Sequence, residues 1–183
     1  RDGLLSRWAA QNTKPQASLD AGRAELLADV TEEWLEAHVE DVDELDAVRE
    51  ELKAQLFLEL IRRGEVKDVI VFTRTKHRSN RLFDFLHKHG VKVERIHGNR
   101  SQAQRTDALE GFKDGRYKVL VATDIAARGI DVEALGHVLN FDVPGLSEDY
   151  IHRVGRTGRA EATGEAYTFV APEEEPDLRA IER

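Results

Sequence analysis

From Lys67 onward, short apolar runs rich in β-branched residues alternate with stretches whose apolar residues recur at helical spacing. Parallel strands need crossover connections, which are usually helices, so this alternation is typical of a parallel sheet covered by helices. The pattern predicts an α/β domain with a mostly parallel sheet of about five strands. The strand candidates are residues 66–73, 91–98, 118–123, 137–143 and 164–171.

Helix signals fall between these runs. Apolar residues at helical spacing predict a helix over residues 79–89. Ser101 and Gln104 have the spacing of a capping box and predict the start of the next helix. Ser147 followed by two acidic residues predicts a further N-cap. We expect the helix begun there to run through Gly155.

Residues 1–66 have a different character. Their apolar residues recur at three- and four-residue steps, which predicts helices with one apolar face. This segment has 8 basic and 16 acidic side chains, against 17 and 14 in residues 67–171. We predict an acidic α-helical segment over residues 1–50, of unknown origin (an insertion, an adaptor or a graft), and a separate domain over residues 51–183. The acidic face could be simply solvated or could bind a partner.

Composition excludes several classes of site. The chain has no cysteine, so disulfides, thiolate metal sites and a cysteine nucleophile cannot occur, and a reducing, cytoplasmic location is expected. No apolar run approaches the roughly 20 residues that cross a bilayer, so no membrane association is expected. Because the sequence begins on Arg1 and contains no Met, we expect a piece of a longer product or an engineered chain.

The stretch HRVGRTGR, residues 152–159, concentrates positive charge in a chain that is acidic overall. If the preceding helix continues, His152, Arg156 and Arg159 lie at positions i, i+4 and i+7 on one stripe. The interleaved glycines leave the backbone open to a bulky anion. Guanidinium groups match phosphate oxygens bidentately, so the stretch predicts a polyphosphate site. A surface salt-bridge cluster is the alternative interpretation.

The stretch ATDIAARGID, residues 122–131, directly follows a strand candidate. Open α/β sheets place ligand contacts at the carboxyl ends of their strands, so Thr123 and Asp124 are expected to project into a crevice. Gly129 can supply a tight turn. Asp131 offers a carboxylate that could accept hydrogen bonds from ribose hydroxyls, and a plain helix cap is the alternative for this residue.

Four cations follow the first two strand candidates. Arg74 and Lys76 come after the first, and Arg100 and Arg105 come after the second. On one edge of a parallel sheet these side chains would form a basic rim, which suits a nucleic-acid backbone bound chiefly through its phosphates. A solvated helix start explains any one of them but does not readily explain all four.

Together these motifs resemble the second RecA-like domain of DEAD-box RNA helicases, with most similarity to the bacterial RhlE-like branch. VFTRTK at 71–76 is similar to motif IV, HG with QAQR at 97–105 to the glycine and QxxR element, ATDIAARGID to motif V and HRVGRTGR to motif VI. The resemblance covers about residues 53–183. It implies a RecA-like fold of the P-loop NTPase type, with three layers.

The resemblance also implies roles for individual residues. Arg156 and Arg159 would be arginine fingers that reach the γ-phosphate of ATP. Gly129 and Asp131 would contact the ribose side of the nucleotide. One RNA strand would be contacted along its sugar-phosphate backbone by Arg74, Gly98, Gln102, Arg105 and Thr123.

Two further residues, His152 and Asp124, would couple the nucleotide and RNA sites. Neither a G-x-x-x-x-G-K-[ST] loop nor an Asp-Glu-Ala-Asp stretch occurs in the chain. The phosphate cradle and the carboxylates that hold Mg²⁺ are therefore expected on an N-terminal RecA-like domain of the same protein, and no metal site is expected here. The whole protein would be an ATP-dependent RNA helicase that unwinds short duplexes, and this chain alone would be inactive as an ATPase.

An alternative from another class is a non-catalytic module built on a RecA-like scaffold. In that interpretation residues 1–50 mediate self-association or bind a protein partner. A DNA-directed motor of the same superfamily is a third hypothesis, which competition between matched RNA and DNA strands would test.

Overall fold

The computed structural model describes residues 42–128, 135–157 and 164–182. The chain divides into two compact units, residues 1–56 and 57–183, and the whole β-sheet belongs to the second. The predicted boundary between residues 50 and 51 stays a prediction. The acidic segment before residue 42 lies outside the described residues.

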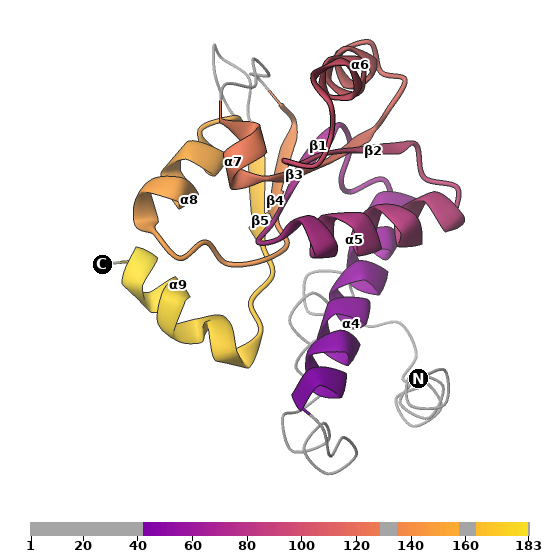
Figure 1. The fold of residues 1–183 in the computed structure, drawn as a ribbon. Helices are drawn as coiled ribbons and strands as arrows, with labels where there is room; N and C mark the ends of the chain where they lie inside the picture. The colour runs from indigo at the N-terminus through magenta and orange to yellow at the C-terminus, as the bar shows by residue number, and fades with distance from the viewer. Residues whose placement is uncertain (1–41, 129–134, 158–163, 183) are drawn as a thin grey trace. The chain divides into compact units, whose positions relative to one another are not determined.

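The sheet has five parallel strands in the order β2-β3-β1-β4-β5 (Figure 1). Because every pairing is parallel, the carboxyl ends of all five strands meet at one edge, and the predicted α/β fold is confirmed. The strands are β1 (Val69–Thr73), β2 (Val93–Ile96), β3 (Val119–Thr123), β4 (His137–Asn140) and β5 (Glu165–Thr168).

Each strand is shorter than the apolar run that predicted it. Val66 before β1 is 3% exposed, and Phe141 and Val143 after β4 are 2% and 0% exposed, yet none of these three residues belongs to a strand. The runs extend past the ladders because buried connections also need apolar side chains, and hydropathy alone does not distinguish pairing from burial.

Helices cover both faces of the sheet, with α5 on one side and α6 and α7 on the other (Figure 1). None of the helices in the described ranges is long and apolar enough to span a membrane. The helices are α4 (Val42–Arg62), α5 (Lys76–Lys88), α6 (Gln102–Lys113), α7 (Asp124–Ala127), α8 (Ser147–Val154) and α9 (Glu175–Ile181), with a 3₁₀ turn η1 (Pro172–Glu174) before α9.

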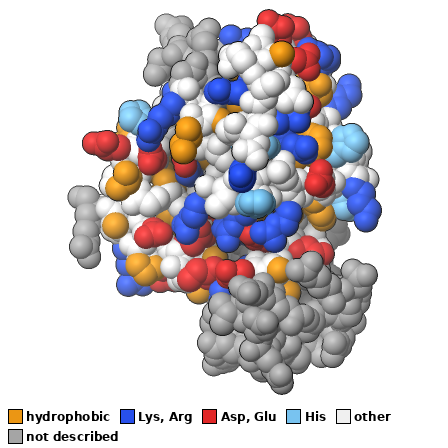
Figure 2. All heavy atoms as spheres, in the orientation of Figure 1, with side chains coloured by type: hydrophobic (Ala, Val, Ile, Leu, Met, Phe, Trp, Pro, Cys, Tyr) orange, Lys and Arg blue, Asp and Glu red, His pale blue; other side chains and the backbone are white. Residues whose placement is uncertain are grey.

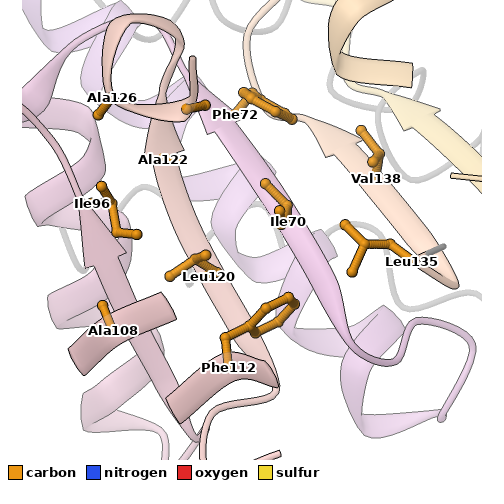
Figure 3. Close-up of a cluster of buried hydrophobic side chains, with 11 residues drawn as sticks. Ile70, Phe72, Ile96, Ala108, Phe112, Leu120, Ala122, Ala126, Leu135 and Val138 are labelled. Atoms are coloured by element: carbon orange, nitrogen blue, oxygen red, sulfur yellow. The ribbon is translucent and has the colours of Figure 1, made fainter. Parts of the chain in front are cut away.

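The inner strands β1 and β3 are apolar almost throughout because both of their faces are covered, whereas the edge strands β2 and β5 include charged and partly exposed residues. Every residue of β1 is buried. Side chains of alternate strand residues pack against α6 and α7 (Figure 3). Because this packing fixes the two helices, it also positions the loops that lead into them at the carboxyl edge of the sheet. The members of this cluster include Ile70, Phe72, Ile96, Ala108, Phe112, Leu120, Ala122, Ala126, Leu135 and Val138.

Two helix starts differ from the sequence prediction. α5 begins at Lys76, before the predicted residue 79, because Thr75 acts as its N-cap and its Oγ1 accepts a hydrogen bond from Arg78 N at 3.2 Å. α8 has Leu146 as its N-cap, with no side-chain hydrogen bond, and Ser147 is already the first helical residue. The predicted N-cap at Ser147 is therefore wrong, since the extended backbone that precedes the helix belongs to Leu146.

The start of α6 follows the predicted capping box. Ser101 Oγ accepts a hydrogen bond from Gln104 N at 3.3 Å, and Gln104 Oε1 accepts one from Ser101 N at 3.0 Å. Two N–H groups that the helix itself cannot satisfy are thus paired locally. This arrangement also holds the loop that leads into α6 from β2.

Replacing this cap should have a measurable cost. Ser101→Ala is expected to lower the free energy of unfolding by about 0.5–2 kcal/mol, because the Gln104 N–H loses its acceptor. Urea denaturation followed by circular dichroism would measure the change. Ser101→Asp keeps a side-chain acceptor and should remain close to the unmodified chain, so equal losses in both variants would contradict the capping role.

Candidate functional site

The carboxyl edge of the sheet holds a hollow of about 190 Å³ between α7 and α8. Complete ligand pockets usually measure about 300–1,000 Å³, so this hollow by itself is smaller than a typical ligand site. We call it the arginine pocket. Its lining residues are Phe72, Asp124, Ala127, Arg128, Asp149, His152, Arg153 and Arg156.

Arg153 is the buried centre of this pocket. Its Nε and Nη2 each donate to one oxygen of Asp124, both at 2.7 Å, and its side chain is 3% exposed. Nη1 donates to Asn140 Oδ1 at 3.1 Å and to the carbonyl oxygen of Asp142 at 2.9 Å. One guanidinium therefore joins the start of α7, the end of β4 and α8.

A second ion pair lies at the rim of the pocket. Arg128 Nη2 is 3.2 Å from Asp149 Oδ1. The Arg128 side chain is 71% exposed, whereas that of Asp149 is 20% exposed. Arg128 is the C-cap residue of α7, and Asp149 lies in the first turn of α8. This pair is the more accessible of the two Arg–Asp pairs in the pocket.

Arg156 lines the pocket from a turn and not from a helix. α8 ends at Val154, and Arg156 N donates to the carbonyl oxygen of Arg153 at 3.2 Å. The carbonyl oxygen of Arg156 accepts a hydrogen bond from Leu135 N at 3.1 Å. The predicted single helical stripe of His152, Arg156 and Arg159 is therefore wrong at Arg156, because the chain leaves the helix to pair with the Leu135 segment.

The other predicted nucleotide residues have different outcomes. His152 is exposed, and it lines the pocket together with Asp124. Gly129, Asp131 and Arg159 lie outside the described residues. Their predicted contacts with a nucleotide stay predictions.

Arg74, the first residue of the predicted basic rim, follows β1. Its backbone N donates to Asp142 Oδ2 at 2.7 Å. Its Nη2 donates to the carbonyl oxygen of Val143 at 3.1 Å and to Glu174 Oε1 at 3.3 Å, and lies 3.5 Å from Asp177 Oδ2. The side chain is 49% exposed, so the guanidinium is held at one nitrogen and reaches solvent.

Arg100 and Arg105, two other rim cations, are positioned by neighbouring groups. Arg100 Nη2 lies 3.3 Å from Glu94 Oε1, and its side chain is 21% exposed. Arg105 Nη2 donates to the carbonyl oxygen of Ala126 at 3.1 Å, so this side chain connects α6 to α7. Lys76, Gly98 and Gln102 are exposed, whereas Thr123, the N-cap residue of α7, is partly buried.

His97 supports the loop between β2 and α6 from within. The imidazole is 4% exposed, its Nδ1 accepts a hydrogen bond from Asn99 N at 3.3 Å, and its Nε2 lies 3.0 Å from Asn80 Oδ1. Since Nδ1 accepts, Nε2 holds the proton and donates to Asn80. Burial lowers the pKa of His97 below its ordinary value, and the nearby cations Arg95, Arg100 and Lys76 lower it further. The ring is neutral near pH 7.

Positive charge is visible on the surface beside these loops. Figure 2 shows Lys and Arg side chains, with His among them, across the middle of the face shown, over α5. The helix starts of α5 and α6 have no acidic residue in their first turns. Such helix N-termini favour anions through the helix dipole. Within the described ranges, no three His, Asp or Glu side chains are grouped as a metal site.

Sequence reasoning missed five of the pocket residues, namely Phe72, Ala127, Arg128, Asp149 and Arg153. Arg153 directly follows His152, so on a helix it points about 100° away from that residue. A signal for a buried cation was present in the run HVLNFDV, where Asn140 and Asp142 interrupt apolar residues and are both 0% exposed. Polar groups in such a run need buried partners.

Comparison with protein families gives one match to this chain. The family described as the helicase conserved C-terminal domain matches residues 52–161. Among curated proteins, the DEAD-box ATP-dependent RNA helicase CshA of Bacillus subtilis is 54% identical over 114 residues, which are 62% of this chain and 23% of the relative. CshA of Geobacillus kaustophilus is 47% identical over 136 residues, 74% of this chain and 29% of the relative. The chain thus spans less than a third of the length of these relatives.

Solved structures show the same likeness. The E. coli DEAD-box protein SrmB, in its crystal structure with the regulator of ribonuclease activity A, is 37% identical, with a TM-score of 0.67 over 70% of this chain and 76% of that one. A DEAD box protein from Methanococcus jannaschii is 38% identical, with a TM-score of 0.67 over 72% of this chain and 36% of that one. The predicted RecA-like fold is confirmed by these matches.

Proposed function

Because the chain belongs to the helicase conserved C-terminal domain family, we propose that it is the second RecA-like domain of a DEAD-box, ATP-dependent RNA helicase. In this function it supplies arginine side chains to ATP hydrolysis and backbone contacts to one RNA strand. The observation that supports this most directly is the arginine pocket, in which three arginines and a histidine surround an open hollow at the carboxyl edge of the sheet.

The pocket supports a division of roles among its arginines. Arg153 is bound to Asp124 through both carboxylate oxygens, so it holds α7 and α8 in place and is a positioning residue. Arg156 lines the same hollow from the turn that follows α8. We assign Arg156, with Arg159 as the second predicted finger, to the γ-phosphate of an ATP delivered by another domain. The ribose contacts are assigned to Gly129 and Asp131.

The RNA strand is proposed to lie along the basic rim. Arg74 and Arg105 are held by neighbouring groups, and Thr123 ends β3 at the carboxyl edge. The exposed Gly98 and Gln102 belong to the loop before α6 and to its first turn. The starts of α5 and α6 add the positive ends of their helix dipoles, which favour phosphate groups. His152 and Asp124 both line the arginine pocket, and we assign to them the coupling of the nucleotide and RNA sites.

Other parts of the proposal depend on regions beyond the described residues. Mg²⁺ and the phosphate loop are assigned to an N-terminal RecA-like domain of the same protein. A cytoplasmic location and the RhlE-like branch are proposed from the sequence, although the curated relatives named above are CshA proteins. Self-association through residues 1–50 stays a prediction, because that segment lies almost wholly outside the described residues.

A domain-replacement chimera tests the proposed function. Residues 52–183 would replace the matching domain of Bacillus subtilis CshA, and ATP hydrolysis would be measured with and without single-stranded RNA. We expect RNA-stimulated hydrolysis from the chimera and none from the present chain alone, because the magnesium ligands are missing here. Matched DNA, which lacks the 2′-hydroxyl, should stimulate less.

The truncated CshA without its own C-terminal domain is the control for the chimera. Hydrolysis by the purified chain alone would contradict the proposal that this chain holds only a part of the ATP site. A folded chimera that binds ATP but is no more active than the truncated control would contradict the role of this domain in catalysis.

A further inference from the structure

We propose that Asp149 competes with the incoming polyphosphate for Arg128, and so sets how tightly the arginine pocket holds its anion. The inference rests on the proposed function, in that it takes the anion to be the triphosphate of ATP. Neither Asp149 nor Arg128 was among the predicted site residues. The evidence is the difference between the two Arg–Asp pairs that line one pocket.

We expect the Asp124–Arg153 ion pair to remain intact when an anion enters the pocket. It has two contacts of 2.7 Å, its arginine is 3% exposed, and the same guanidinium has two further acceptors. An anion entering the pocket would have to leave several buried groups unpaired to capture Arg153. That exchange is unfavourable, so this pair acts as scaffold.

We expect the Arg128–Asp149 ion pair to break when an anion enters the pocket. It has one contact, of 3.2 Å, and its arginine is 71% exposed, so solvent and salt weaken the attraction. Arg128 can turn away from Asp149 into solvent, so its own charge is not left buried and unpaired. A phosphate offers the guanidinium a bidentate, charge-assisted partner, which is stronger than this single contact.

Asp149 remains an effective competitor because its own position is fixed. It lies in the first turn of α8, where the helix dipole favours a negative charge, and its side chain is 20% exposed. The carboxylate therefore stays at the pocket rim when Arg128 leaves. Its repulsion of phosphate and its hold on Arg128 both lower the affinity for a polyanion.

The competition predicts the effect of removing one charge. Asp149→Asn should lower the Kd of the full chain for inorganic tripolyphosphate by roughly three- to tenfold, since an exposed ion pair is released and one repulsive charge is lost. Titrations followed by ¹H–¹⁵N NMR would give Kd, and the Arg128 Nε–H signal would report directly on that guanidinium. The gain should shrink as salt is raised.

A double-mutant cycle shows whether Asp149 acts through Arg128. In an Arg128→Gln background, most of the gain from Asp149→Asn should disappear. Asp107→Asn is the matched control, because it removes one carboxylate from an exposed Arg–Asp pair outside the pocket, formed by Asp107 of α6 and Arg116. It should change Kd by less than about twofold.

The outcomes separate this inference from the proposed function. If the chain binds tripolyphosphate and Arg156→Gln weakens binding, but Asp149→Asn does no more than Asp107→Asn, the competition is wrong and the anion site stands. An equal gain in the Arg128→Gln background would likewise overturn the competition. If neither the unmodified chain nor Asp149→Asn binds tripolyphosphate, the proposed function of the pocket fails as well.

Discussion

Arg156→Ala is expected to lower the kcat of RNA-stimulated ATP hydrolysis by about 10³- to 10⁵-fold in the chimera with the CshA N-terminal part. The charge on the transferring phosphoryl group grows in the transition state, and a guanidinium placed there stabilises the transition state more than the bound substrate. Arg156 lines the pocket at the end of α8, where such a group is needed. Because the contact is made mainly in the transition state, kcat and kcat/KM should fall together.

Two controls make this result specific to Arg156. Arg156→Lys keeps the charge but loses the planar fork, so it should restore only a part of the activity. Arg116→Ala removes an arginine that pairs with Asp107 outside the pocket and should leave hydrolysis unchanged. RNA affinity, measured by fluorescence anisotropy, should be retained in every variant. Near-normal kcat in Arg156→Ala would overturn the finger assignment.

The second large effect concerns stability. Arg153→Met is expected to lower the free energy of unfolding of the chain by about 3–5 kcal/mol, as is typical when one partner of a buried ion pair is removed. The change leaves Asp124 without its bidentate partner and leaves the acceptors Asn140 Oδ1 and Asp142 O without their donor. Methionine keeps much of the aliphatic stem, so the loss reports on the charge. Urea denaturation would measure it.

The pocket itself supplies the matched control for this prediction. Arg128→Met removes an arginine of the same kind from the exposed pair with Asp149, and it should cost no more than about 1 kcal/mol. The double variant Arg153→Met, Asp124→Asn should lose less than the sum of its single changes, because no uncompensated charge remains. Equal losses for Arg153→Met and Arg128→Met would contradict the scaffold role of Arg153.

Several elements could be predicted because their signals are local. The capping box of Ser101 and Gln104 involves residues three positions apart, and it forms as predicted. The strand candidates identified all five strands. The signal was strongest for β1 and β3, because a strand covered on both faces is apolar along its length. Strand ends were less predictable, because Phe141 and Val143 are buried without being paired.

The organisation of the arginine pocket could not be predicted in the same way. Three arginines stand within eight residues of HRVGRTGR, and sequence spacing selected Arg156 and Arg159. The structure shows that Arg153 is the buried one, paired with an aspartate 29 positions away. The end of α8 was also missed, since it depends on the hydrogen bond between Arg156 and Leu135. Neither contact has a signature in the local spacing.

The sequence by itself determined the parallel α/β class, the order of the strands along the chain and the presence of several arginines near their carboxyl ends. These features follow from hydrophobic periodicity and residue chemistry, which are properties of short segments. Only the tertiary structure decided which arginine is buried in an ion pair and which is exposed. Burial and partner geometry set that difference, and both arise where α7, α8 and β4 meet.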